Sequence, residues 1–364
     1  MSVHRIDEVW DQRGRGRGQR FVRVHRRLTA ICIAVAVAAG SSIAIAGAIA
    51  GRPSGVKAAS TSATKASAPN KLAPPPVPGA NHAYLGVDAN FGKGSTGDQV
   101  QAFEHMMGGA VGIASFYVAF LQMPPLAQMH AVYKTGAIPM LNMKCGASDA
   151  SVAAGQWDRQ LRKLAVDLRS FKSPVFFRWF WEMNLPKANS HAACLAGHGG
   201  GGYIAAYHHI WNIFHSVGAK NVSFVWAPSD AGHVPHSADL TFWPGASYVD
   251  WIGADLYDRQ QVHKTFGHEF DAFYRFWHAA EPSKPIILSE TGAVGTAAQV
   301  TWLQQITACL TRKVHMTRET PYTQVKAIIY VDAVDKFSYV LKPGTAGHKT
   351  YASMLHLAFF HARG

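Results

Sequence analysis

Eight short apolar segments alternate with amphipathic segments after residue 81, and this alternation is the main structural signal in the chain. A short apolar run bounded by turn residues is typical of a strand that is buried on both faces. Segments of this kind are predicted as strands over Tyr84–Ala89, Ala110–Tyr117, Ala137–Cys145, Val175–Glu182, Val222–Pro228, Tyr248–Tyr257, Pro285–Glu290 and Val325–Asp332. The clearest helical patterns are Val152–Phe171, Gly202–Val217, Phe266–Ala280, Ala297–Thr311 and Lys349–His361.

Eight strands alternating with helices over about 280 residues predict an α/β fold of the (β/α)8 TIM-barrel type, which usually takes about 250 residues. A doubly wound sheet is the alternative to the barrel. The glycine run Gly199–Gly202 lacks the Lys-Ser/Thr of a phosphate-binding loop, so we expect it to form a flexible lid.

Two glutamates stand out because each ends a predicted buried strand. Residues 81–364 contain six glutamates, and only Glu182 and Glu290 occupy such positions. Arg178 and Glu182 are four residues apart, which places them on the same side if the strand runs through both. A structural ion pair is the simpler interpretation of that stretch alone. The second glutamate instead suggests the paired carboxylates of glycosidic bond hydrolysis.

Other polar and aromatic residues stand at or just after the ends of predicted strands. The C-terminal ends of barrel strands meet at one face, so these side chains are expected to share a substrate-binding cleft with the two glutamates. The predicted cleft residues are Asp88, Arg178, Trp181, Asn184, Trp226, Asp255, Tyr257 and Asp332.

The chain before the barrel divides into three parts by composition. Residues 1–27 are Arg-rich and are predicted as a basic cytoplasmic tail, and residues 28–50 contain no charged side chain. This run is long enough to span a bilayer, so it is predicted as either an uncleaved transmembrane anchor or a cleaved signal segment. Residues 51–80 are rich in Ala, Ser and Pro and are predicted as a linker to the domain at 81–364. Either route places the domain outside the cytoplasm, membrane-anchored or secreted.

The net charge of +13 belongs mostly to the tail and linker, so it does not indicate a nucleic-acid partner. An oxidising compartment permits disulfides, and loops at one barrel mouth would bring Cys145 close to Cys194. These two cysteines are predicted to pair, and Cys309 is expected to remain a buried thiol. The spacing of Cys and His residues does not define a zinc site. No metal or cofactor is predicted, and the expected state is a monomer.

With these residues in view, residues 81–362 resemble glycoside hydrolase family 26, the β-mannanase-type barrels of clan A. Four motifs carry the resemblance in the expected order: Arg178 followed by Glu182-Met183-Asn184, Phe224–Pro228, Tyr248–Tyr257, and Pro285 leading to Glu290-x-Gly. The family usually has His directly before the first glutamate, where this chain has Trp181.

The resemblance implies a retaining hydrolase in which Glu182 is the acid/base and Glu290 the nucleophile. It also implies that Tyr257 donates a hydrogen bond to the nucleophile and that Arg178 orients the carboxylates. Burial among aromatic side chains is expected to raise the pKa of Glu182. The substrate would be a β-linked polysaccharide of manno, gluco or xylo configuration. A non-catalytic carbohydrate-binding barrel is the alternative that Trp181 favours.

Overall fold

The computed structural model describes residues 72–89, 96–185, 191–196, 198–229, 239–259, 265–311 and 322–361. The predicted basic tail, the predicted membrane segment at 28–50 and most of the predicted linker lie outside these residues. Within the described part of the chain, no helix combines the length and the apolar character needed to cross a membrane.

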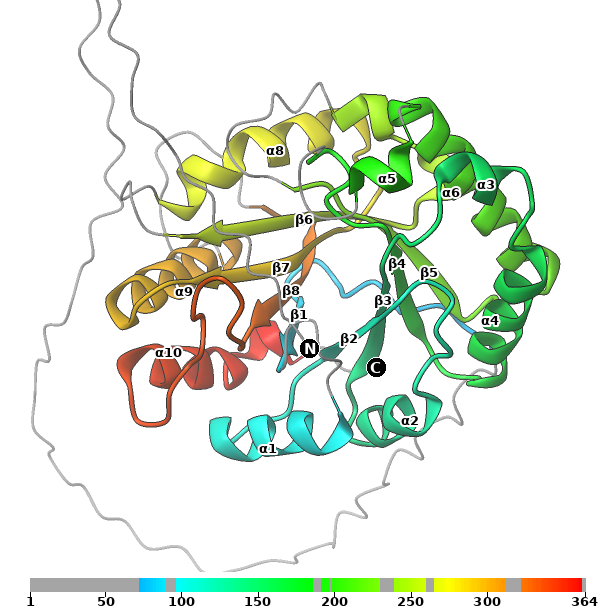
Figure 1. The fold of residues 1–364 in the computed structure, drawn as a ribbon. Helices are drawn as coiled ribbons and strands as arrows, with labels where there is room; N and C mark the ends of the chain where they lie inside the picture. The colour runs from blue at the N-terminus through cyan, green and yellow to red at the C-terminus, as the bar shows by residue number, and fades with distance from the viewer. Residues whose placement is uncertain are drawn as a thin grey trace, which may run out of the picture. The chain divides into compact units, whose positions relative to one another are not determined.

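Eight parallel strands follow one another in chain order around a closed barrel, and helices surround them (Figure 1). The strands are β1 (Tyr84–Asp88), β2 (Ile113–Val118), β3 (Ile138–Met143), β4 (Val175–Trp179), β5 (Val222–Trp226), β6 (Trp251–Asp258), β7 (Ile286–Ala293) and β8 (Val325–Val331). The α-helices are α1 (Gly97–Met107), α2 (Leu126–Lys134), α3 (Asp149–Ala153), α4 (Asp158–Ser170), α5 (His191–Leu195), α6 (Gly199–Ser216), α8 (Phe266–Ala280), α9 (Thr296–Thr311) and α10 (Ala346–Leu355). The predicted (β/α)8 barrel is therefore confirmed.

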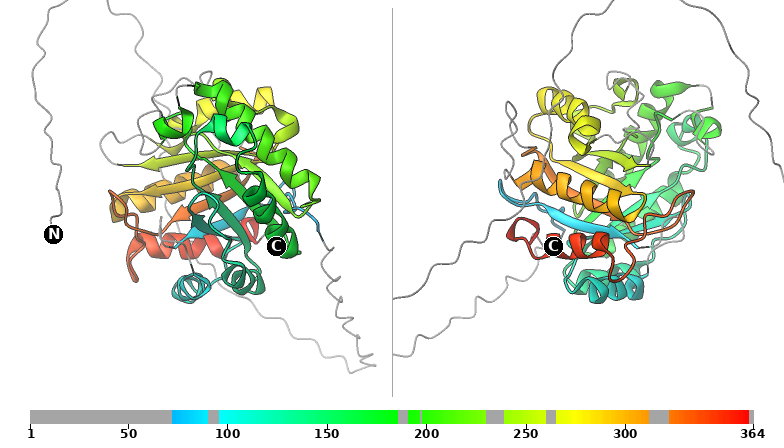
Figure 2. Two further views of the ribbon diagram at one scale, coloured as in Figure 1. Left: turned by 45° about the vertical axis from the view of Figure 1, so that its right-hand side comes forward. Right: turned by 90° about the vertical axis from the view of Figure 1, so that its left-hand side faces the viewer.

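The strands are buried on both faces, which explains why their sequences are apolar without alternation. Side chains such as Phe176 and Val225 pack inside the barrel, whereas their neighbours Phe177 and Trp226 pack in the layer that includes the helices. The outer layer is visible from two further directions in Figure 2, where the helices lie against the outside of the strands. The side of the strand on which a residue lies thus decides whether it can reach the site.

The predicted helix Val152–Phe171 is two helices, α3 and α4. Gly155, between them, has a φ of +77°, a conformation that interrupts a right-handed helix and that glycine adopts without steric cost. The amphipathic pattern continues across this break, so hydrophobic periodicity alone did not reveal it.

The predicted lid at Gly199–Gly202 is wrong, because these glycines form the first turn of α6. A Cβ atom on Gly200 would lie 1.6 Å from the carbonyl oxygen of Thr241, and one on Gly202 would lie 2.0 Å from a carboxylate oxygen of Asp149. Glycine is needed at these two positions because other chain segments approach the helix closely.

Part of the segment predicted as a linker lies against the barrel. The Tyr84 hydroxyl donates to the carbonyl oxygen of Pro76 at 2.8 Å, and the Lys326 ammonium donates to that of Gly79 at 2.9 Å. The last residues of the predicted linker therefore belong to the folded domain.

Candidate active site

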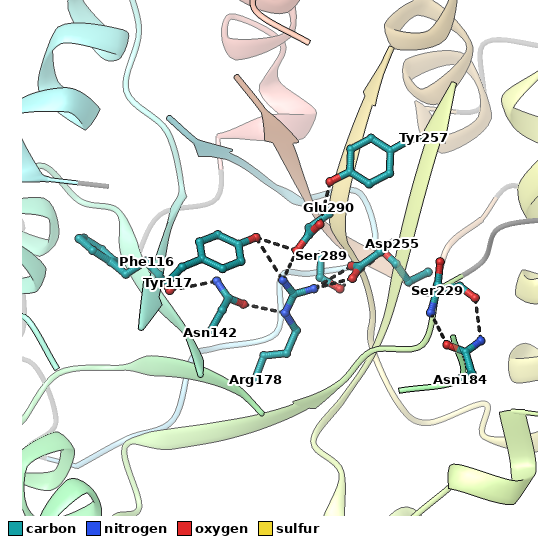
Figure 3. A network of polar contacts seen from close by, with 11 residues as sticks. Phe116, Tyr117, Asn142, Arg178, Asn184, Ser229, Asp255, Tyr257, Ser289 and Glu290 are labelled. Carbon is teal, nitrogen blue, oxygen red and sulfur yellow. Dashed lines mark hydrogen bonds and ion pairs between the residues drawn. The ribbon is translucent and has the colours of Figure 1, made fainter. Parts of the chain in front are cut away.

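Glu290, on β7, lies at the centre of a buried hydrogen-bond network (Figure 3). Its Oε1 accepts from the Tyr117 hydroxyl at 2.7 Å and from Nη2 of Arg178, and its Oε2 accepts from the Tyr257 hydroxyl at 2.7 Å. These donors come from β2, β4 and β6. Hydrogen bonds from three donors, one of them cationic, fix the orientation of the Glu290 carboxylate.

Arg178 joins the carboxylates of this network. Its side chain is fully buried, and Nη1 donates to both carboxylate oxygens of Asp255 at 2.8 Å. Nε donates to Oδ1 of Asn142 at 2.6 Å. Burial raises the pKa of the Asp255 carboxyl, and the adjacent guanidinium opposes that shift. Because Asp255 and Asn142 hold the guanidinium, Arg178 positions Glu290 rigidly.

Glu182 reaches the site on a turn and not on a strand. The strand predicted as Val175–Glu182 ends at Trp179, and Phe180 and Glu182 have φ values of +47° and +54°. The amide of Glu182 donates to the carbonyl oxygen of Ala227 at 2.9 Å, which ties the turn to the end of β5. The argument that placed Arg178 and Glu182 on one side of a single strand was therefore wrong, although both residues interact with Glu290.

The surroundings of Glu182 raise its pKa to about 7. Burial is the largest cause, and the negative charge of Glu290 adds to it. A hydrogen bond with Ser229 and the charges of Arg259 and Arg178 oppose the shift. Glu182 can therefore hold a proton near neutral pH beside the carboxylate of Glu290, which is the division of roles that an acid and a nucleophile require.

Trp181 lies against the residues that bind Glu290. The centre of its ring is 5.1 Å from the guanidinium carbon of Arg178 and 5.3 Å from the centre of the Tyr117 ring, which meets it edge to face. The side chain is half-buried, so part of the indole faces solvent at the site. An indole at this position can supply a flat apolar surface for a sugar ring.

Asn184, predicted to bind substrate, is instead a buried link between two turns. Its Nδ2 donates to the carbonyl oxygen of Ser229 at 2.9 Å and to Asp239 at 3.1 Å, and its Oδ1 accepts from the Ser229 amide at 2.8 Å. Asn184 therefore fixes Ser229, the residue that hydrogen-bonds to Glu182.

The prediction that Trp226 lines the cleft is wrong. Its side chain is fully buried on the outer side of the barrel, where it packs against Trp243 and Trp277 and donates to the carbonyl oxygen of Phe242 at 3.0 Å. Successive side chains of a strand point to opposite faces. Because Val225 packs inside the barrel, its neighbour Trp226 faces outward.

Two predicted aspartates lie near strand ends with different surroundings. Asp332 accepts a hydrogen bond from the Leu341 amide at 2.6 Å, so its carboxylate holds the loop that follows β8. This contact explains Asp332 without a substrate. Asp88 is buried at the end of β1, and its charge contributes to the raised pKa of Tyr117 after burial and Glu290, which places it beside the network.

Sequence reasoning missed Tyr117, Asn142 and Arg259 as residues of the site. A weak signal existed for Asn142, a polar residue inside the apolar strand Ile138–Met143. Tyr117 lies near the end of its strand, as the predicted residues do. Arg259 directly follows β6, where its guanidinium carbon lies 4.6 Å from the centre of the Tyr257 ring.

Cys145 and Cys194 form a disulfide, with their Cα atoms 6.1 Å apart. The bridge links the segment after β3 to α5, both beside β4 in chain order. Cys309 is buried on α9 and is not disulfide-bonded. Among the described residues, no cluster of His, Cys, Asp and Glu could hold a metal ion.

A closed (β/α)8 barrel with buried carboxylates at the C-terminal ends of its strands has the architecture of barrel enzymes. The particular class follows from the sequence: a family model for glycosyl hydrolase family 26 matches residues 89–309, more than half of the chain. The chain belongs to this family, which confirms the resemblance found in the sequence.

Curated relatives of the chain are several carbohydrate-active enzymes. A β-1,3-xylanase from Vibrio sp. is 24% identical over 160 residues, 44% of this chain and 32% of the relative. Endoglucanase H from Acetivibrio thermocellus is 26% identical over 219 residues, 57% of this chain and 24% of the relative. The chain thus spans about a third or less of the length of these proteins.

Solved structures with the same fold include a Cellulomonas fimi endo-β-1,4-mannanase double mutant, with a TM-score of 0.58 and 16% identity. That match covers 77% of this chain and 72% of the mannanase. The family 26 domain of an endo-β-mannanase/endo-β-glucanase from Prevotella bryantii has a TM-score of 0.55 and 14% identity, covering 77% and 90% of the two chains. At these identities the structural likeness shows the fold alone.

Proposed function

We propose that the chain is a retaining glycoside hydrolase of β-linked polysaccharides, with Glu182 as acid/base and Glu290 as nucleophile. The observation that carries the proposal is the contrast between the two carboxylates. Glu290 accepts hydrogen bonds from Tyr117, Arg178 and Tyr257, whereas the pKa of Glu182 is raised to about 7. A carboxylate oriented by three donors beside a carboxyl that keeps its proton is the pairing a double displacement needs.

The proposed reaction has two steps. Glu182 donates its proton to the glycosidic oxygen as the carboxylate of Glu290 attacks the anomeric carbon, which releases the leaving sugar and forms a glycosyl ester. Glu182, now ionised, takes a proton from water, whose oxygen attacks the same carbon and frees Glu290. Tyr257 and Arg178 hold Glu290 in line for attack in both steps.

The proposed substrate is a β-linked glycan, with β-mannan first because the motifs of the chain resemble the β-mannanase-type barrels. β-Xylan and β-glucan remain in the proposal because the curated relatives are a xylanase and an endoglucanase. Trp181 would pack against the sugar nearest the scissile bond, since its indole lies against Arg178 and Tyr117.

The test is hydrolysis of a panel of β-mannan, β-1,3- and β-1,4-xylan and β-glucan by the purified chain and its variants. Glu182→Ala and Glu290→Ala are each expected to lower kcat/KM by about 10²-fold or more, the size of a lost acid/base or nucleophile. Glu281→Gln, a change at the end of α8, is the matched carboxylate control and is expected to retain activity. Substrate binding with no product from the unaltered chain would instead support a non-catalytic carbohydrate-binding barrel.

The two roles can be separated with azide as an external nucleophile. With an activated β-glycoside, the Glu290→Ala variant should yield the α-glycosyl azide, because azide replaces the nucleophile from the same face. The Glu182→Ala variant should yield the β-glycosyl azide, formed on the covalent intermediate. The opposite pairing of products would reverse the assignment, and inversion by the unaltered chain would contradict the retaining mechanism.

We also propose that the domain acts outside the cytoplasm. The charge-free run at 28–50 after an Arg-rich segment supports this placement, and the Cys145–Cys194 disulfide fits an oxidising compartment. Cell fractionation of the full chain and of a variant lacking residues 28–50 is the test, and cytoplasmic recovery of both would contradict it.

A further inference from the structure

Arg259 lies at the site but has no part in the proposed chemistry. Its Nε donates to the Tyr339 hydroxyl at 3.1 Å, and its guanidinium carbon lies 4.6 Å from the centre of the Tyr257 ring. Tyr257 in turn donates to Glu290, so a single aromatic side chain separates Arg259 from the proposed nucleophile. Two contacts hold the guanidinium in place, and this lowers the entropy it would lose on binding a ligand.

Arg259 is held at the site by its contacts with Tyr339 and Tyr257 and not by an ion pair with a described carboxylate. The residue is exposed, and no carboxylate in the described parts of the chain forms an ion pair with it. The buried guanidinium of Arg178, by contrast, is bound to both Asp255 and Glu290. Arg259 and Glu182 are near enough to interact electrostatically. When Glu182 is protonated, this electrostatic interaction with Arg259 is lost.

The donors left on Arg259 have a particular chemical preference. With Nε committed to Tyr339, the two terminal nitrogens remain as a planar pair of donors, which matches the two oxygens of a carboxylate. A single neutral sugar hydroxyl accepts from only one of these donors, whereas a carboxylate accepts from both and also carries the opposite charge. The group that complements these donors best is an anionic group carried by the substrate.

We infer that Arg259 binds the carboxylate of a uronic acid residue beside the scissile bond, so that the substrate is an acidic β-glycan. This inference rests on the proposed hydrolase function. It makes Arg259 a specificity-determining residue that acts on substrate choice and not on bond cleavage.

The experiment compares each acidic polymer with its own carboxyl-reduced form, in which a hydroxymethyl group replaces the uronate carboxyl. Glucuronoxylan and β-linked glucuronomannan are the probes, at low ionic strength where exposed charges are least screened. For the unaltered chain, kcat/KM on the acidic form of its preferred polymer is expected to exceed that on the reduced form by about tenfold or more. This is the size of effect that one charge-assisted hydrogen bond produces. In Arg259→Gln this ratio should fall close to one, with Arg259→Lys between the two.

Two controls separate this role from others. Lys336 lies in the segment between Val334 and Ser338, two residues that form an antiparallel bridge. Lys336→Gln removes the same charge as Arg259→Gln and should leave the ratio of kcat/KM on the acidic and reduced polymers unchanged. If Arg259 only adjusts the protonation of Glu182, Arg259→Gln will shift the pH profile equally on both forms and preserve the ratio, which overturns the inference. Equal cleavage of both forms by the unaltered chain also overturns it but leaves the hydrolase function standing. Failure to cleave any polymer, neutral or acidic, overturns both.

Discussion

Glu182 and Glu290 have the same side chain, and their surroundings make them chemically different. Glu290 accepts from two hydroxyls and a guanidinium, whereas Glu182 is half-buried near the charge of Glu290 with Ser229 as its hydrogen-bond partner. The negative charge of one carboxylate helps to keep the proton on the other. This dependence means that neutralising Glu290 alone should also lower the pKa of Glu182.

The pH dependence of activity follows from the raised pKa of Glu182. Because the proposed first step requires Glu182 to be protonated, kcat/KM should fall as pH rises through about 7, by about tenfold per pH unit beyond it. The measurement is kcat/KM for a glycan oligosaccharide between pH 4 and pH 9, roughly the range in which carboxyls with shifted pKa values titrate. A profile that already falls above about pH 5 would mean that the Glu182 carboxyl behaves as an ordinary glutamate.

At the residue scale, the sequence predicted the carboxylate pair and two of the donors to Glu290, Arg178 and Tyr257, but not the other polar residues of the network. Glu182 and Glu290 were detectable because a glutamate beside an apolar run is unusual. Tyr117 and Asn142 were not, because their roles depend on how β2, β3 and β4 pair, which brings Asn142 opposite Arg178. Trp226 was misplaced for the related reason that an aromatic near a strand end can face either side of the sheet.

At the scale of elements, the first turn of α6 shows that glycines in sequence need not mean flexibility. Gly200 lies against the backbone of Thr241 in the short helix Leu240–Phe242, and Gly202 lies against Asp149. Gly201, between them, faces open space. The run therefore allows α6 to pack closely against Thr241 on one side and Asp149 on another.

This arrangement predicts opposite outcomes for two neighbouring substitutions. Gly200→Ala should lower the free energy of unfolding by about 1–3 kcal/mol or more, because its new methyl group overlaps a backbone oxygen that has little room to move. Gly201→Ala is the matched control and should be neutral or stabilising by up to about 1 kcal/mol, since alanine is the better helix former. Chemical denaturation of both variants measures the difference, and equal stabilities would contradict the packing described for α6.

Strand boundaries show where an apolar pattern misleads at this scale. Phe180 and Trp181 continue the apolar run of β4, so the sequence predicts a strand as far as Glu182. The chain instead turns after Trp179 and takes left-handed backbone conformations at Phe180 and Glu182. Such conformations are uncommon for residues other than glycine, and nothing in the local composition indicates them.

For the whole molecule, barrel closure was predictable, because eight buried strands alternating with helices leave few other topologies. The disulfide adds a constraint that the hydrophobic core does not provide. Cys145 and Cys194 are separated by 49 positions in the sequence. The stretch between them includes β4 and the turn that carries Glu182.

Removing the disulfide should therefore reduce the stability of the whole domain. The Cys145→Ser/Cys194→Ser variant is expected to lose about 4 kcal/mol of unfolding free energy, from the chain-entropy treatment of a loop of this length. Thermal unfolding with and without a reductant is the measurement. Reductant should lower the Tm of the unaltered chain but not that of the double variant, and Cys309→Ala should keep the sensitivity to reductant. If reductant does not lower the Tm of the unaltered chain, the expectation is contradicted.

Glu290 is built into a hydrogen-bonded strand, whereas Glu182 is carried by a turn outside the sheet ladder. An insertion or deletion after Trp179 could therefore shift one carboxyl relative to the other without breaking any pairing in the barrel. Since the separation of the two groups determines whether a glycosidase retains or inverts configuration, this turn is a place where the stereochemical outcome could change during evolution while the core stays intact.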